Sequence, residues 1–116
     1  MSFQGSCHCG AVGFTVNADL PASAISCNCS HCRRKGFLLS FFPAELFTLD
    51  RGADDLQSYQ FNTHQIDHRF CRHCGTQPVA YGANPDGSLV RAVNLRCVPD
   101  IDLDALTVQK YDGASR

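Results

Sequence analysis

The sequence predicts an all-β domain built from short strands, and three observations carry this prediction. Apolar residues alternate with small or polar ones, as at Val12, Phe14 and Val16, which is typical of a half-buried strand. Turn-forming sequences, such as those at 50–52 and 84–87, separate runs of strand length. No window of the sequence carries a long apolar stripe with the period of a helix.

Each predicted element follows from its own apolar run and from the turn that bounds it. The continuous apolar run at 37–42 is ended by Pro43, and the Asn-Pro-Asp-Gly turn at 84–87 predicts a hairpin. Short helical turns are predicted just after Pro43 and around 100–106. Besides the run at 12–16, the predicted strands are 37–42, 46–49, 56–61, 66–70, 77–81, 89–95 and 107–111.

Length and charge exclude several classes of protein. The 116 residues suit a single domain, 1–116, with one modest core. A net charge of -1 and a pI near 6.5 do not favour nucleic acid or an anionic membrane as partner. The longest apolar stretch is too short to cross a bilayer, and residues 1–6 do not resemble a signal peptide. We therefore expect a cytoplasmic protein, in which eight cysteines indicate metal binding rather than disulfides.

Seven of the cysteines fall into three tight groups, at 7–9, 27–32 and 71–74. Zinc binds about four ligands with Zn–S distances near 2.3 Å, which places the sulfurs roughly 3.8 Å apart. Two residues of an extended strand advance about 6.6 Å, so a Cys-x-Cys pair can chelate one ion only where the chain bends. Each group is therefore predicted to lie in a loop between strands.

Two of the three groups are followed directly by glycine. Gly10 follows the first group and Gly75 the third, whereas Arg33 follows the middle one. Glycine readily adopts the positive φ that a tight chelating turn tends to need after its last ligand. This difference pairs the first and third groups into one closed four-thiolate site made of Cys7, Cys9, Cys71 and Cys74.

The middle group then forms a three-thiolate site of Cys27, Cys29 and Cys32. Three protein ligands with one open position are typical of catalytic zinc, whereas structural sites are closed. A fourth protein ligand would close the site and make it inert. The candidates for that ligand are Cys97, His31, His64 and His68.

Three segments of the sequence resemble one known family. Residues 5–12, 27–33 and 70–76 are similar, in the same order, to the glutathione-dependent formaldehyde-activating enzyme family, which also includes centromere protein V. The tail between 91–96 and 111–113 resembles short bacterial members of that family. The resemblance implies a β-tent of short antiparallel sheets related to zinc ribbons. It also implies two zinc ions as cofactors, one structural and one whose fourth place takes water or the glutathione thiol.

The chemistry that the resemblance implies is that of a carbon–sulfur lyase. A thiol bound to zinc is deprotonated at neutral pH, and the thiolate is the reactive nucleophile. Glutathione, or a related thiol, would add to an aldehyde carbon, as in S-(hydroxymethyl)glutathione formation, with Cys27, Cys29 and Cys32 as the catalytic group. Arg33 and Arg34 would bind the carboxylates of glutathione, although they also suit a solvated basic turn.

Several alternatives remain open at this stage. The protein can instead be a non-catalytic, zinc-stabilised binding module with a closed second site, or a redox sensor if the middle cysteines hold no metal. His31 can relay a proton, but an exposed loop position suits it as well, and His64 and His68 are expected to be partly exposed. Cys97 suits a buried apolar position, and core positions are expected for Phe37, Phe41 and Phe42. The sequence leaves the physiological thiol, the aldehyde and the oligomeric state open.

Overall fold

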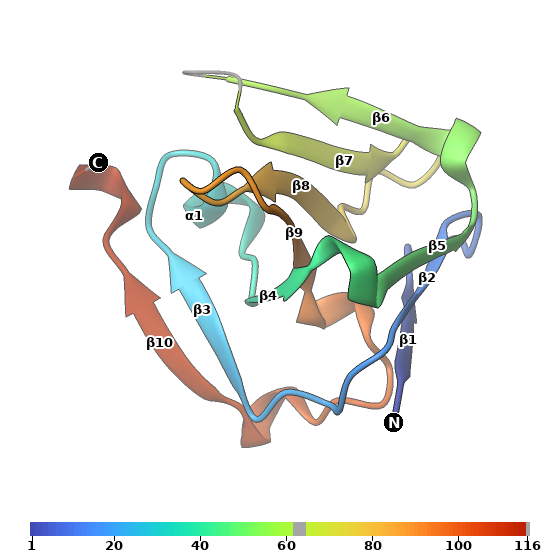
Figure 1. Cartoon of the computed structure of the whole chain (residues 1–116), viewed down its shortest axis with the longest axis horizontal. Coiled ribbons are helices and arrows are strands. Elements are labelled where there is room, and N and C mark those ends of the chain that lie inside the picture. Colours follow the sequence, from blue (N-terminus) through green and yellow to red (C-terminus); the bar gives the residue numbers. More distant parts are fainter. Residues whose placement is uncertain (62–64, 116) are drawn as a thin grey trace.

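The structure, a computed structural model, describes residues 1–61 and 65–115 and is mostly β. Figure 1 shows a short sheet beside the N-terminus and a long, strongly curved sheet that runs from the C-terminal strand round to β6 and β7. The all-β prediction is confirmed, and His64, one of the candidate ligands, lies outside the described residues.

The strands are short because Gly, Pro and Asp turns interrupt the sequence every few residues. Their bounds are β1 Phe3–Ser6, β2 Gly13–Val16, β3 Ser23–Cys27, β4 Leu39–Pro43, β5 Phe47–Arg51, β6 Leu56–Tyr59, β7 Asp67–Cys71, β8 Val79–Ala83, β9 Leu89–Asn94 and β10 Thr107–Tyr111. One α-helical turn, α1 Cys32–Lys35, joins β3 to β4. The 3-10 turns are η1 Ala44–Leu46, η2 Ala53–Asp55, η3 Leu95–Cys97, η4 Leu103–Ala105 and η5 Gly113–Ser115.

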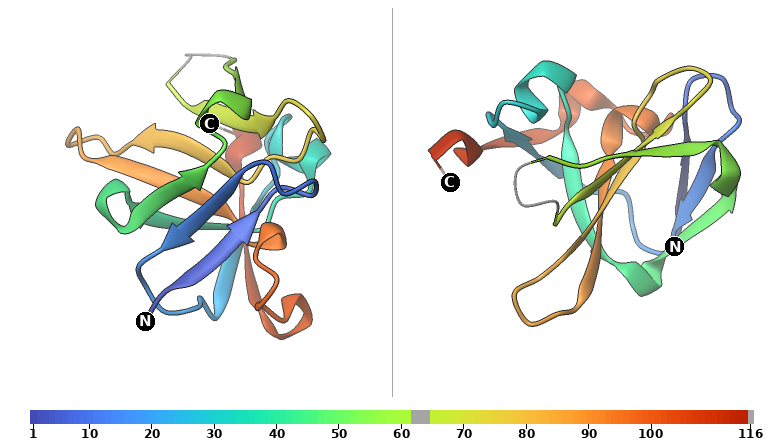
Figure 2. Two further views of the ribbon diagram at one scale, coloured as in Figure 1. Left: turned by 90° about the vertical axis from the view of Figure 1, so that its right-hand side faces the viewer. Right: turned by 90° about the horizontal axis from the view of Figure 1, so that it is seen from above.

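The strands form two sheets. The smaller has the order β1-β2-β5, and the larger has the order β10-β3-β4-β9-β8-β7-β6. All pairings among the described residues are antiparallel except that of β10 with β3, which is parallel. The predicted hairpin at 84–87 joins β8 to β9, with Gly87 at a φ of 89°. The two further views in Figure 2 show the small sheet packed across one end of the larger one.

Two strands, the α-helical turn and three of the 3-10 turns (η2, η3 and η5) were not predicted from the sequence. β1 and β3 carry few large apolar side chains, and α1 is only one turn long. The predicted helical turn after Pro43 is present as η1, and the one around 100–106 is present as η4, where the Asp102 side chain accepts a hydrogen bond from the Asp104 N–H.

The apolar residues pack into three separate clusters. The largest fills the space between the sheets with Phe3, Phe14, Val93, Leu95 and other buried residues. Two smaller clusters contain cysteines of the candidate sites: one packs Cys32 with Phe37 and Leu39, and the other packs Cys7 and Cys71 with Val12. Each group of cysteines therefore has its own apolar support outside the main core.

The three phenylalanines expected in the core have different environments. Phe37 is buried and Phe42 is partly buried against the main cluster, but 51% of the Phe41 side chain is exposed. The core prediction for Phe41 was wrong because Phe41 faces the side of the sheet opposite to Phe42, and the small cluster that buries Leu39 on that side does not include Phe41. No helix of the described residues is long and apolar enough to cross a membrane.

Candidate metal centres

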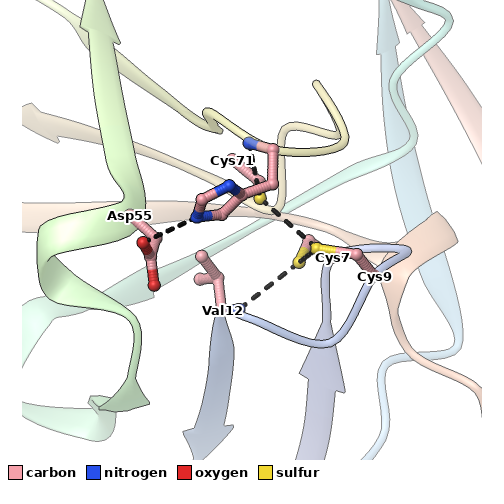
Figure 3. Close-up of polar contacts among 6 residues, drawn as sticks. Cys7, Cys9, Val12, Asp55 and Cys71 are labelled. Atoms are coloured by element: carbon pink, nitrogen blue, oxygen red, sulfur yellow. Dashed lines mark hydrogen bonds and ion pairs between the residues drawn. The ribbon is translucent and has the colours of Figure 1, made fainter.

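The first cysteine cluster joins the turn between β1 and β2 to the turn between β7 and β8. The sulfur atoms of Cys7, Cys9, Cys71 and Cys74 all lie within 4.8 Å of one another. Cys9 Sγ is 3.7 Å from both Cys7 Sγ and Cys71 Sγ, and the three side chains converge in Figure 3. Sulfurs bound to one tetrahedral zinc ion would be roughly 3.8 Å apart, so this donor set fits a single metal ion.

The local backbone explains why these four sulfurs can meet. Gly10 and Gly75 have φ values of 83° and 79°, in the left-handed region that favours glycine. The tight turns also direct backbone N–H groups at the sulfurs. The Val12 N–H donates to Cys7 Sγ at 3.3 Å, and the His73 N–H donates to Cys71 Sγ at 3.4 Å.

Two of the four thiols, Cys9 and Cys74, have pKa values shifted in opposite directions. A hydrogen bond from the Thr76 side chain is the largest cause that lowers the pKa of Cys74, to about 5. The Ala11 N–H lowers the pKa of Cys9, but desolvation and the neighbouring thiols outweigh it and raise that pKa to about 11. Cys74 therefore loses its proton readily, whereas the neighbouring thiols disfavour ionisation of Cys9. A bound cation would offset this effect, because its positive charge favours both thiolates.

The second cysteine cluster lies at the other end of the long sheet. Cys27 ends β3, Cys29 lies in the following loop, and Cys32 begins α1, with all three sulfurs within 4.8 Å of one another. The Cys32 N–H donates to Cys29 Sγ at 3.3 Å. Arg33 continues into the helical turn, which Gly36 ends at a φ of 72°. The middle motif thus positions its candidate metal ligands with a helical turn, whereas the other two motifs position theirs with glycine turns.

The acidities of the second cluster favour a mixed protonation state. Burial raises the pKa of Cys29, but the backbone N–H of Cys32 and other hydrogen bonds outweigh burial and lower that pKa overall. Burial, followed by the neighbouring Cys29 and Cys27, raises the pKa of Cys32. Of these two thiols, Cys29 therefore loses its proton more readily than Cys32.

None of the candidate fourth ligands within the described residues joins this cluster. Cys97 is buried in the main core, where its Sγ lies 3.9 Å from the Gln77 carbonyl oxygen. Burial, followed by Cys7 and Cys74 of the first cluster, raises the pKa of Cys97 to about 12. The buried position expected for this cysteine is therefore correct.

His31 and His68, the two candidate histidines within the described residues, pack against aromatic rings and are not part of the thiol cluster. The ring of His31 packs on Phe37, Tyr59 and Phe61, and its centroid is 4.0 Å from that of His68. The partly exposed position expected for His68 was wrong, because only 5% of this residue is exposed. Its environment is set by Phe61 and His31, which come from other parts of the chain.

A cavity of about 420 Å³ opens beside the second cluster. Cys27 and Cys32 line it together with Arg33 and with Lys110 of β10. Arg34 lies in a different cavity, and its guanidinium donates a hydrogen bond to the Ser30 carbonyl oxygen at 2.7 Å. The two adjacent arginines therefore point into separate cavities.

The C-terminal tail forms part of the second cluster, which sequence reasoning missed. Asn28 is its anchor: the backbone N–H donates to the Tyr111 carbonyl oxygen at 3.1 Å, and the side chain donates to Asp112 Oδ1 at 3.1 Å. The Ala114 N–H in turn donates to Asn28 Oδ1 at 2.9 Å. An Asn between two cysteines was the one signal for this anchor in the sequence.

The comparisons with known proteins agree with this architecture. The family model of the glutathione-dependent formaldehyde-activating enzyme matches residues 2–104. A curated protein of Halomonas elongata, whose name assigns it provisionally to the same kind of enzyme, is 31% identical over 84 residues. That match covers 66% of this chain and 54% of the relative, so the chain spans about half the length of the curated relative.

One solved structure shares the fold. A crystal structure of a Rhodobacter sphaeroides protein from structural genomics matches with a TM-score of 0.76 and 30% sequence identity. The match covers 91% of this chain and 99% of that one. From its three cysteine motifs, its fold and the family match over residues 2–104, the chain belongs to the glutathione-dependent formaldehyde-activating enzyme family.

Proposed function

We propose that this protein is a zinc-dependent enzyme of the carbon–sulfur lyase type. It acts on the adduct of glutathione, or of a related thiol, with an aldehyde, as in S-(hydroxymethyl)glutathione formation. One observation carries the proposal: among the described residues three thiols converge with no fourth ligand, and two of them line an open cavity. The family match supports the choice of glutathione and formaldehyde.

Each cysteine cluster would hold one zinc ion. Cys7, Cys9, Cys71 and Cys74 supply four thiolates, which is the donor set of a structural site. Cys27, Cys29 and Cys32 supply three, which leaves room for a thiol from solution. When bound at the second cluster, zinc would keep such a thiol deprotonated at neutral pH.

The residues of the chain would bind and orient the thiol. Arg33 and Lys110 line the cavity beside the cluster, where they would attract the carboxylates of glutathione. The reaction needs little more from the protein. The thiol loses its proton, the sulfur electron pair forms a bond to the aldehyde carbon, and the carbonyl oxygen takes a proton from water. The lyase direction reverses these steps.

The two adjacent arginines would have different roles. Arg33 contacts the carboxylate, because it lines the same cavity as Cys27 and Cys32. Arg34 was grouped with it on the sequence, but its guanidinium is bonded to Ser30 in another cavity. We further propose that residues 1–116 form one zinc-binding domain that works in the cytoplasm, since both clusters need reduced thiols.

Exchange of formaldehyde between its hydrate and its glutathione adduct tests this function. Carbon-13 exchange spectroscopy on the zinc-loaded protein should show faster exchange than buffer alone. Cys27→Ser should abolish the acceleration, and Arg33→Gln should raise the KM for glutathione about tenfold. Arg72→Gln, a matched change at an exposed position, is the control. A folded, zinc-loaded protein that leaves the exchange rate at the buffer value would show that the chain is a non-catalytic binding module.

A further inference from the structure

A second cavity, larger than the one beside Cys27 and Cys32, lies between the loop of the second cluster and the loop that carries Cys71 and Cys74. Its volume is about 590 Å³, within the usual range for small-molecule sites. The loop of the second cluster contributes His31, Arg34 and Lys35, and the loop of the first cluster contributes Gln77. No cysteine lines this cavity, so it is separate from the site proposed for glutathione.

Gln77 lines the inner end of the cavity, and His68 lies directly behind Gln77. Only 4% of Gln77 and 5% of His68 are exposed, and Gln77 Nε2 lies 3.0 Å from His68 Nδ1. An amide nitrogen can only donate, so His68 Nδ1 accepts and the proton of the neutral ring is on Nε2. Within the described residues, neither His68 Nε2 nor Gln77 Oε1 has a hydrogen-bond partner.

The unpartnered atoms indicate which hydrogen-bonding groups a ligand would need along the edge that faces them. An unpaired buried donor or acceptor costs free energy, which a ligand that satisfies it recovers. His68 Nε2–H calls for an acceptor, and Gln77 Oε1 calls for a donor. His31 Nδ1 is also buried and unpartnered among the described residues, and His31 lies beside His68. A ring that carries adjacent C=O and N–H groups provides this combination.

The side walls are aromatic. The ring of His31 is inclined by only 18° to that of Tyr59 and by 28° to that of Phe61, with centroids 5.7 Å and 5.2 Å apart. Tyr59 is about half exposed, so its ring is accessible from solvent. Rings of this kind favour a planar ligand, which can stack on them.

The mouth of the cavity is positively charged. Arg34 and Lys35 line it, both are exposed, and no lining residue in the described part of the chain is acidic. One N–H of the Arg34 guanidinium donates to the Ser30 carbonyl oxygen, which leaves four N–H donors for a ligand. A carboxylate or phosphate on the ligand would therefore be attracted to this side.

We propose that this cavity binds a planar heterocyclic anion whose ring edge offers both a C=O acceptor and an N–H donor. The ring stacks against Tyr59 and Phe61, the edge meets Gln77 and the histidine behind it, and the acidic group meets Arg34. This site goes beyond the proposed thiol chemistry and does not depend on it.

Three small probes separate these features. Orotate carries the lactam edge and a carboxylate, 6-methyluracil carries the edge alone, and benzoate carries the carboxylate alone. Calorimetric titration of the zinc-loaded protein should give orotate an affinity about tenfold above either of the others. The proposal is overturned if orotate does not bind, or if all three probes bind alike.

Adjacent arginines provide a matched pair of variants. Arg34→Gln should weaken orotate binding about fivefold or more, whereas Arg33→Gln, the same change on the other side of the loop, should leave it near the wild-type value. Orotate should also shift the nitrogen-15 resonance of His68 Nε2 in the wild-type protein. Equal effects of the two arginine variants, or an unmoved His68 resonance at saturation, would place the anion elsewhere and overturn the assignment.

Discussion

The backbone of Gly113 lies directly against the sulfur of Cys27: a Cβ atom added at Gly113 would be 2.5 Å from Cys27 Sγ. The same Cβ would be 3.2 Å from the Cβ of Cys29. Residues more than eighty positions apart in the sequence therefore share one wall of the second cluster. The metal affinity of that cluster should depend on the tail as well as on the three cysteines.

Gly113→Ala tests this close approach. The added methyl group must displace either the tail or Cys27, so we expect metal affinity at the second cluster to fall about tenfold while the first cluster keeps its ion. Competition with a chromophoric chelator measures both affinities. The control is Gly82→Ala, where the new Cβ makes only an ordinary contact of 3.7 Å with Val90. Equal affinities in the two variants would show that the tail does not shape the site.

Asn28 should hold the tail in place. Asn28→Ala removes the two side-chain hydrogen bonds to Asp112 and Ala114, at a cost of about 1 kcal/mol because both are exposed. We expect faster amide hydrogen exchange at Ala114 and little change elsewhere. Asn84→Ala, which removes a comparable exposed bond to Ser88, is the control. Unchanged exchange at Ala114 would refute the anchoring role.

The two clusters should differ in their effect on stability. Cys9 and Cys71 are 62 residues apart and join both sheets, so Cys9→Ser should leave the chain largely unfolded at room temperature. Cys27→Ser affects a local loop, and its Tm should fall by about 5 °C or less. Far-UV circular dichroism during heating measures both. Similar melting curves for the two variants would contradict the division into a structural and a functional site.

The lowered pKa of His68 predicts how the stability of the fold depends on pH. Burial, then the charges of His31 and Lys35, lower its pKa from 6.5 to about 4, and Asp67 only partly opposes them. The unfolded chain therefore binds a proton more readily than the folded one. The stability due to neutral His68 is fully present above pH 6.5 and is lost as the pH falls toward 4, by up to about 3 kcal/mol.

A variant isolates this contribution from that of the metal ligands. His68→Asn keeps an acceptor near Gln77 Nε2 but has no proton to gain. Urea unfolding between pH 7.5 and 4.5 should show a steeper loss of stability in the wild type than in this variant. Parallel curves would mean that His68 titrates normally in the folded protein.

Local patterns in the sequence were enough to predict most of the strands and the cysteine groups. The ligand motifs are short, and the glycines after Cys9 and Cys74 indicated which groups belong together. The structure brings those four thiols together and leaves the other three as a separate cluster. The turn at 84–87 was equally explicit, because its residues specify a hairpin.

Features that depend on distant residues could not be predicted. The parallel pairing of β10 with β3 places the tail over Cys27, and nothing in the sequence near Gly113 indicates this neighbour. His68 was expected to be an ordinary, partly exposed histidine, whereas the ring is buried by Phe61 and His31. Burial of this kind is a property of tertiary packing, not of local pattern.

In the proposed function, the second cluster holds a metal ion with one position open to a thiol. Cobalt substitution tests it most directly, through the visible spectrum recorded while glutathione is added. We predict two cobalt ions per chain and one set of bands that shifts saturably, a response that Cys27→Ser abolishes while the first ion stays bound. Two bound ions whose bands do not respond to glutathione would mean a closed second site and would contradict the account.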